Sequence, residues 1–159
     1  MKISFALAII STIFITSQAQ NNPIDYIAAH KSARSAVGVA TLVWDTNLAK
    51  YAQTYANQRA ADCNLVHSAT EDYGENIAVG YGYSNGFTGV DAVNLWVAEK
   101  PHYDYYSNTC KNGECGHYTQ VVWRDTVRLG CARVTCKNGG VFVTCNYDPP
   151  GNYEGEKPY

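Results

Sequence analysis

RLGCARVTCKNGGVFVTCNY, residues 128–147, is the stretch that most constrains the fold. Its two halves, 128–136 and 141–147, are rich in β-branched and aromatic residues, which favour strands. The intervening KNGG, residues 137–140, is a turn signal, because Asn-Gly suits the backbone angles of tight hairpins. The stretch therefore predicts an antiparallel hairpin near the C-terminal end of the chain.

Upstream of the hairpin, the sequence predicts helices. Residues 24–38 place Ile24, Ile27 and Ala28 at helical spacing, and residues 88–100 begin with a Thr88-x-x-Asp91 capping pattern and end at Pro101. Between them, a strongly amphipathic helix is predicted after a cap at Asp45 or Thr46, with its apolar face at Leu48, Tyr51, Ala52, Tyr55 and Ala56. Helices followed by an antiparallel sheet indicate a single α+β domain.

Two shorter segments are harder to assign. ENIAVG, residues 75–80, is interpreted as a short helix before a Gly/Tyr-rich loop. GHYTQVVW, residues 116–123, is interpreted as a strand buried on both faces, with His117 at its rim. A histidine there belongs either to a hydrogen-bonded core or to a functional site.

The six cysteines predict three disulfides, and counting alone leaves 15 pairings open. The hairpin brings Cys131 within one residue of Cys145, so a single bulge would pair them and contribute about 3 kcal/mol. The other expected pairs are one across a four-residue loop and one joining the helical half to the sheet: Cys110–Cys115 and Cys63–Cys136. The sequence contains no C-x2-C pair, so a zinc site made of cysteines is not expected.

The N-terminus reads as a secretory signal peptide, residues 1–19, with apolar residues 3–15 and a mature start at Gln20. Without Lys2, 11 basic and 14 acidic side chains remain, formally −3, with no basic block. This balance argues against nucleic acid as a partner, and no later apolar run is long enough to cross a membrane. We expect an exported protein, in the apoplast or vacuole, and a monomer.

Two motifs carry a family resemblance. GHYTQVVWRDT (116–126) and FVTCNYDPPGNY (142–153) resemble the paired signatures of the CAP superfamily, and GEN (74–76) and LWVAEK (95–100) match further markers. The whole mature chain is similar to the plant pathogenesis-related protein 1 family. One marker differs, because Lys31 stands where the family's His-Asn-x-x-Arg has its asparagine. The resemblance implies a three-layer α-β-α sandwich, and the family's disulfide pattern agrees with the three expected pairs.

The resemblance also implies a central cleft formed by His67, Glu75, Glu99 and His117. Imidazoles and carboxylates would suit Zn²⁺ or another divalent ion, although no cofactor is required. The alternative is that His–Glu hydrogen bonds only satisfy buried polar groups. No catalytic residue is assigned: G-x-S-x-G and H-E-x-x-H are absent, and bridged cysteines offer no thiol nucleophile. A metal-dependent extracellular hydrolase working in this cleft is the alternative function.

Two further segments complete the functional prediction. Tyr81, Tyr83 and Phe87 lie in a glycine-rich loop that is either an ordinary mobile loop or a lipid-contacting lip. Members of the superfamily bind sterols, which implies a secreted antimicrobial protein that captures sterol or lipid from microbial membranes. The tail, residues 149–159, resembles a segment that some plant relatives release as a defence-signalling peptide. Its prolines and glycines favour an accessible end, and the alternative is a strap packed on the domain.

Overall fold

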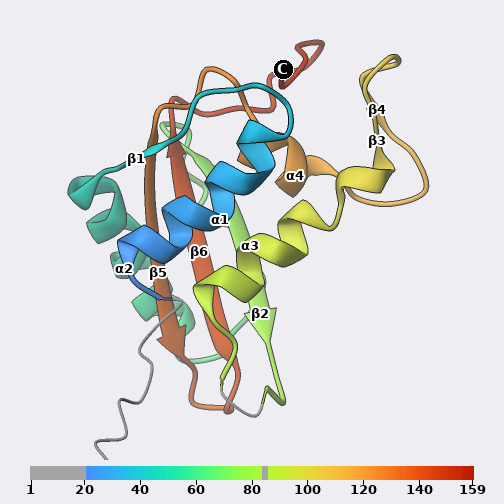
Figure 1. Ribbon diagram of the computed structural model, residues 1–159. Coiled ribbons are helices and arrows are strands. Elements are labelled where there is room, and N and C mark those ends of the chain that lie inside the picture. Colours follow the sequence, from blue (N-terminus) through green and yellow to red (C-terminus); the bar gives the residue numbers. More distant parts are fainter. Residues whose placement is uncertain (1–20, 84–85) are drawn as a thin grey trace, which may run out of the picture.

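Figure 1 shows the computed structural model, which describes residues 21–83 and 86–159. The predicted signal peptide, residues 1–19, and Gln20 lie outside the described residues. Within the described part, the helices are α1 (Pro23–Ser35), α2 (Thr46–Arg59), α3 (Gly89–Val97), the 3-10 helix η1 (Lys100–His102) and α4 (Gly116–Val121). The strands are β1 (Val43–Trp44), β2 (Gly74–Gly80), β3 (Tyr103–Asp104), β4 (Thr109–Cys110), β5 (Arg128–Thr135) and β6 (Val141–Asp148).

The predicted hairpin, β5 and β6, forms the centre of the sheet. The strand order is β1-β5-β6-β2, with β1 parallel to β5 and the other neighbours antiparallel. Cys131 lies directly opposite Cys145, and Cys136 closes the turn by donating its N–H to the Gly140 carbonyl at 2.8 Å. The one-residue mismatch that the sequence predicted between Cys131 and Cys145 is accommodated in the turn rather than by a bulge in the strands. In this turn Gly139 has a φ of 82°, which favours glycine.

Helices cover both faces of the sheet, which gives the expected three layers. Figure 1 shows α1 and α3 in front of the strands and α2 behind them. Alternate residues of β6 serve the two faces: Val143 and Tyr147 belong to the core under α1, α3 and α4, whereas Phe142 packs with α2. Gly130 permits the close approach of α2, because a Cβ there would lie 2.1 Å from the Ala49 nitrogen.

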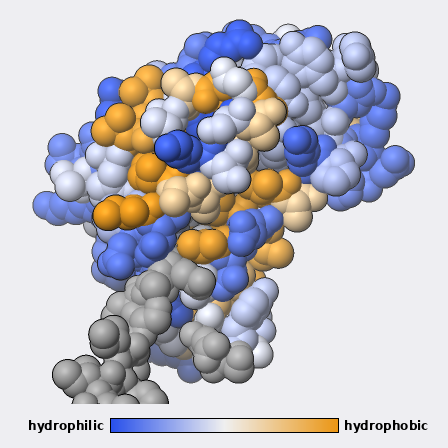
Figure 2. All heavy atoms as spheres, viewed as in Figure 1, coloured by the Kyte–Doolittle hydropathy of each residue, from blue (hydrophilic) through white to orange (hydrophobic). Residues whose placement is uncertain are grey.

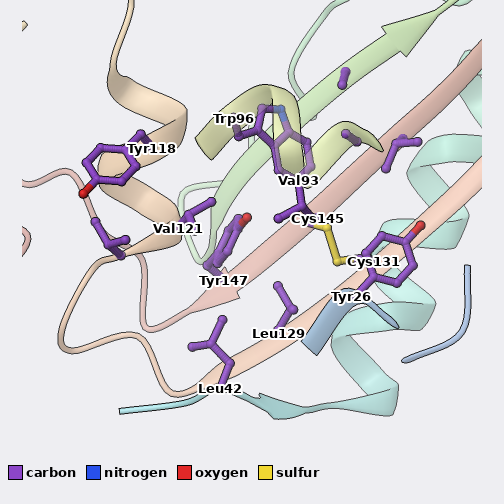
Figure 3. Packing of buried hydrophobic residues seen from close by; sticks show 14 of the residues in the cluster. Tyr26, Leu42, Val93, Trp96, Tyr118, Val121, Leu129, Cys131, Cys145 and Tyr147 are labelled. Atoms are coloured by element: carbon purple, nitrogen blue, oxygen red, sulfur yellow. A yellow bond between two sulfur atoms is a disulfide. The ribbon is translucent and has the colours of Figure 1, made fainter. Parts of the chain in front are cut away.

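Figure 3 shows part of the larger core cluster, which contains Trp96, Tyr118, Tyr147 and the Cys131–Cys145 disulfide, with Tyr118 at the end of the cluster away from the disulfide. All six cysteines are described and none is free. The three expected pairings are confirmed: Cys63–Cys136, Cys110–Cys115 and Cys131–Cys145. The first of these joins the loop after α2 to the turn of the hairpin, across 73 residues of sequence.

The strand predicted for residues 116–123 is wrong: this segment forms α4. Both ends of this short helix are satisfied by distant side chains. Glu99 accepts hydrogen bonds from the backbone N–H groups of His117 and Tyr118 at 3.0 and 3.2 Å. At the other end, the buried guanidinium of Arg34 donates to the carbonyls of Val121 and Trp123 at 3.0 and 2.8 Å. These tertiary caps outweigh the β-branched composition of the segment.

The short helix predicted for residues 75–80 is also wrong, because these residues belong to β2 and pair with β6 along their whole length. In α1, the predicted span is approximately right but the buried face is not. Ile24 is 79% exposed, whereas Tyr26, His30 and Arg34 are buried. The buried face of α1 is thus largely polar and invisible to a search for apolar periodicity.

The molecular surface is mixed in character. Figure 2 shows apolar residues scattered among charged ones over the face formed by α1 and α3, with mostly hydrophilic colours on the projecting arm that carries β3 and β4. No helix in the described part of the chain has the length and apolar character needed to cross a bilayer.

Candidate functional site

His67 and Glu75 form the first half of the cleft. His67 lies in the loop after α2, and its Nδ1 donates to Glu75 Oε1 at 2.8 Å. Glu75, on β2, also accepts from the backbone N–H of Ser68 at 2.9 Å. Burial alone would raise the pKa of Glu75, but the hydrogen bonds from His67 and Ser68 lower it, and the same carboxylate raises the pKa of His67. Glu75 therefore stays ionised and fixes the His67 ring.

His117 and Glu99 form the second half. His117 opens α4, and its Nδ1 donates to Glu99 Oε1 at 2.6 Å while its backbone N–H bonds the other carboxylate oxygen. Burial would raise the pKa of Glu99, but the hydrogen bond with His117 and the added backbone bonds lower it. The His117 ring also stacks on Trp96, with centroids 6.3 Å apart.

The two histidines face one hollow of about 250 Å³, which is lined by His67, Glu75, Asn76, Glu114, Gly116, His117 and Asn152. Glu99 is not part of this lining, and it is connected to the hollow through its hydrogen bonds to His117. In the neutral form of each ring, Nδ1–H is donated to the carboxylate and Nε2 is the nitrogen that carries the lone pair. The structure thus forms two His–Glu pairs from the four residues that the resemblance implied, and three of the four, His67, Glu75 and His117, line the same hollow.

These groups fit a metal ion in one respect and not in another. An imidazole whose second nitrogen is held by a carboxylate is the usual arrangement around a metal-binding histidine. However, among residues 21–83 and 86–159 no group of three or more His, Cys, Asp or Glu side chains is placed to hold an ion together. A divalent ion here would take its protein ligands from the two Nε2 atoms, with Glu75 and Glu99 as outer supports.

The sequence reasoning missed three residues of the hollow: Asn76, Glu114 and Asn152. Asn76 and Asn152 hold the backbone of α4, through bonds to the carbonyls of His117 at 3.0 Å and Gly116 at 2.8 Å. Both asparagines lie inside motifs that carried the resemblance, GEN and FVTCNYDPPGNY, so this was the available signal.

A buried polar chain extends from α1 to the cleft. His30 bonds the Tyr26 carbonyl through Nδ1 at 2.8 Å, so Nδ1 carries the proton and Nε2 accepts from the Tyr147 hydroxyl at 2.9 Å. Tyr147 in turn accepts from Asn76 at 3.2 Å. Burial lowers the pKa of His30 from 6.5 to about 4, which keeps this ring neutral. Each hydrogen bond in this series has a defined donor and acceptor, and the last one joins Asn76 to the His117 carbonyl beside the site.

The predicted lipid-contacting loop lies away from the cleft. Tyr81 and Tyr83 follow the end of β2, whereas Glu75 lies at its beginning, roughly 17 Å away at 3.4 Å per residue. Tyr81 and Tyr83 are 55% and 47% exposed. The prediction that Phe87 contacts lipid is wrong, because Phe87 is 1% exposed and packs in the core.

The C-terminal strap, residues 149–159, is anchored near its two ends and exposed between them. Its last residue, Tyr159, stacks on Tyr105 at 5.2 Å, and the Pro158 carbonyl accepts from the Arg124 N–H at 2.7 Å. Residues 152–157 between these anchors and the sheet are exposed. The end of the chain is therefore packed on the domain, as in the alternative prediction, and residues 152–157 are accessible.

Comparison with known proteins identifies the class to which this fold and cleft belong. The model of the CAP, or cysteine-rich secretory protein, family matches residues 27–147. The chain belongs to this family. Curated relatives include pathogenesis-related protein 1A of Nicotiana tabacum, 61% identical over 89% of this chain and 83% of that protein. Pathogenesis-related protein 1 of Arabidopsis thaliana is 54% identical over 96% and 92%. These homologues support a plant defence protein of the CAP family.

Solved structures agree with the fold. Schistosoma mansoni venom allergen-like protein 4 superposes with a TM-score of 0.66 and 29% identity, covering 84% of this chain and 90% of that one. A crystal structure of NaASP2 with Zn²⁺ gives a TM-score of 0.71 and 25% identity, covering 89% and 88%.

Proposed function

We propose that this protein is a secreted plant defence protein that acts by binding sterol or another membrane lipid, and that it is antimicrobial against fungi and oomycetes for that reason. The observation that carries the proposal is the 61% identity to a pathogenesis-related protein over most of both chains. Tyr81 and Tyr83 are the contact candidates, since exposed aromatic rings offer apolar area with a polar tip to a lipid surface.

The test compares two tyrosine variants. A Tyr81→Ser/Tyr83→Ser protein should lose binding to radiolabelled sterol in vesicles and should lose growth inhibition. Tyr106→Ser is the matched control, because Tyr106 is 94% exposed on the β3–β4 arm and should be dispensable. Excess free sterol should abolish the inhibition by the wild type. Equal sterol binding by both variants, or inhibition that survives excess sterol, would contradict the proposal.

A divalent ion at His67 and His117 is a second part of the proposal. Its support is the pair of free Nε2 atoms backed by carboxylates, together with a structural relative crystallised with Zn²⁺. Titration calorimetry with Zn²⁺ should show one site that His117→Ala removes and a chelator reverses. If His117→Ala instead abolished a measurable hydrolytic turnover of the wild type, the enzyme alternative would replace the binding function.

The C-terminal strap is proposed as the source of a signalling peptide of residues 149–159. Support comes from its lack of helix or strand and its exposed middle. The bond before Pro149 follows β6, where Asn146 and Tyr147 are 0% exposed, so cleavage there requires the end of β6 to open. Mass spectrometry of extracellular leaf fluid after wounding should detect the peptide, and finding only intact C-termini would argue against its release.

A further inference from the structure

We propose that the C-terminal strap is a structural part of the cleft, with Asn152 as the positioning residue for the turn of α4 that carries His117. The role deepens the metal binding proposed for the cleft, and rests on it for one measurement only. Nothing in the family resemblance assigns a part in the cleft to the strap.

The contacts of Asn152 place it at the start of α4. Its Nδ2 donates to the Gly116 carbonyl at 2.8 Å, and its Oδ1 accepts from the Thr119 hydroxyl at 2.7 Å. Thr119 also bonds the carbonyls of Cys115 and Gly116. One side chain of the strap therefore holds both ends of the first helical turn, and His117 lies between them.

The strap also shapes the space in front of the histidines. Asn152 lines the 250 Å³ hollow that contains His67 and His117. It lines, in addition, a neighbouring cavity of about 340 Å³ between α4, the β3–β4 arm and the strap itself. Gly116 and Asn152 are common to the two cavities, so the strap forms the boundary between them.

Contacts on both sides of Asn152 keep it in place. The adjacent Gly151 N–H donates to the Gln120 side chain of α4 at 3.0 Å. Farther along, Asn108 donates to the Glu156 carbonyl at 2.9 Å, and Tyr159 is anchored among aromatic rings of the arm. Detaching the strap would remove these bonds together, because no helix or strand of its own would hold Asn152 at α4.

The consequence is a coupling between the tail and the cleft. A ligand that binds more tightly when the first turn of α4 is ordered also stabilises the docked strap. Loss of the strap lowers the affinity for that ligand by the same factor. Proteolytic release of residues 149–159 would therefore lower the ligand affinity of the cleft as well as liberate a peptide.

The decisive variant is Asn152→Gly in the full chain. Asn152 has a φ of 61°, so glycine removes the side chain without backbone strain, whereas alanine would add it. Asn112→Gly is the matched control, an exposed asparagine with a φ of 64° and no side-chain bond among the described residues. Two readouts apply: amide exchange of Thr119 and Gln120 by NMR, and Zn²⁺ affinity by calorimetry.

We expect Asn152→Gly to speed exchange in α4 and to weaken Zn²⁺ about tenfold, the usual scale for loss of an outer support. Asn112→Gly should change neither, and Tyr159→Ala should reproduce the exchange effect. Exchange rates equal in Asn152→Gly and Asn112→Gly would overturn the positioning role. If the wild type did not bind Zn²⁺, the metal proposal would fail, but the exchange comparison would still decide the role of the strap.

Discussion

Acid should destabilise this protein through His30, a residue outside the cleft. The ring is 0% exposed, and burial, assisted by the nearby Arg34 charge, lowers its pKa from 6.5 to about 4. In the unfolded chain His30 takes up a proton near pH 6.5, so between pH 6.5 and 4 the unfolded state binds more protons. The stability contributed by neutral His30 is complete above pH 6.5 and is lost as the pH falls toward 4.

The size of the effect follows from that shift. Each pKa unit corresponds to 1.36 kcal/mol, so the loss is about 2 kcal/mol by pH 5 and about 3 kcal/mol by pH 4. Protonation would also put a donor on Nε2 where the Tyr147 hydroxyl already donates, while Asn76 occupies the acceptor side of that hydroxyl. The loss is thus expected from the geometry as well as from the burial.

The assay is urea unfolding, with disulfides intact, from pH 7.5 to 4. The comparison variant is His30→Gln, which can donate to the Tyr26 carbonyl and accept from Tyr147 without titrating. The other histidines and the carboxylates are present in both proteins, so their contributions, including the opposite one of His67, cancel in the difference. The wild type should lose about 3 kcal/mol more than His30→Gln across this range. Parallel curves would refute the reasoning.

Two more predictions concern stability. Arg34→Met should cost about 4 kcal/mol in the free energy of unfolding, since it leaves the buried carbonyls that Arg34 satisfies without a donor; a loss below about 1 kcal/mol in chemical denaturation would show that water replaces the guanidinium. Replacing Cys63 and Cys136 together by alanine should cost about 4 kcal/mol, and the same change at Cys110 and Cys115 about 2 kcal/mol, because the first bridge closes the longer loop. Equal losses in melting experiments would count against the loop-entropy explanation.

The sequence was sufficient where the local pattern and the tertiary environment agree. The β5–β6 hairpin, the Thr88–Asp91 capping box and α2 were predicted from such patterns, and α2 begins after its Asp45 cap as expected. The three disulfide pairings followed from the hairpin and from loop lengths. The grouping of the cleft residues could not be derived in this way, because His67 and His117 are 50 residues apart and only the family resemblance connects them.

The failures have a shared cause. α4 is too short to form by propensity, and its ends are completed by Glu99 and Arg34, which are 18 and 87 residues from their partners in the chain. Nothing within residues 116–123 shows these partners. Phe87 was misplaced for a related reason, because a glycine-rich loop in sequence gave no indication that its last aromatic residue returns to the core.

The same carboxylate serves the fold and the site, and this determines which variants are informative. Glu99 caps the first N–H groups of α4 with one oxygen and holds the His117 ring with the other. Glu75 likewise joins the loop at Ser68 to the His67 ring. Removing either carboxylate would disturb local structure and the imidazole together, so loss of ligand binding in Glu99→Ala would not separate the two effects. Replacing His117 keeps the cap, because its backbone N–H still reaches Glu99. The imidazole variants, rather than the carboxylate ones, therefore test what the cleft binds.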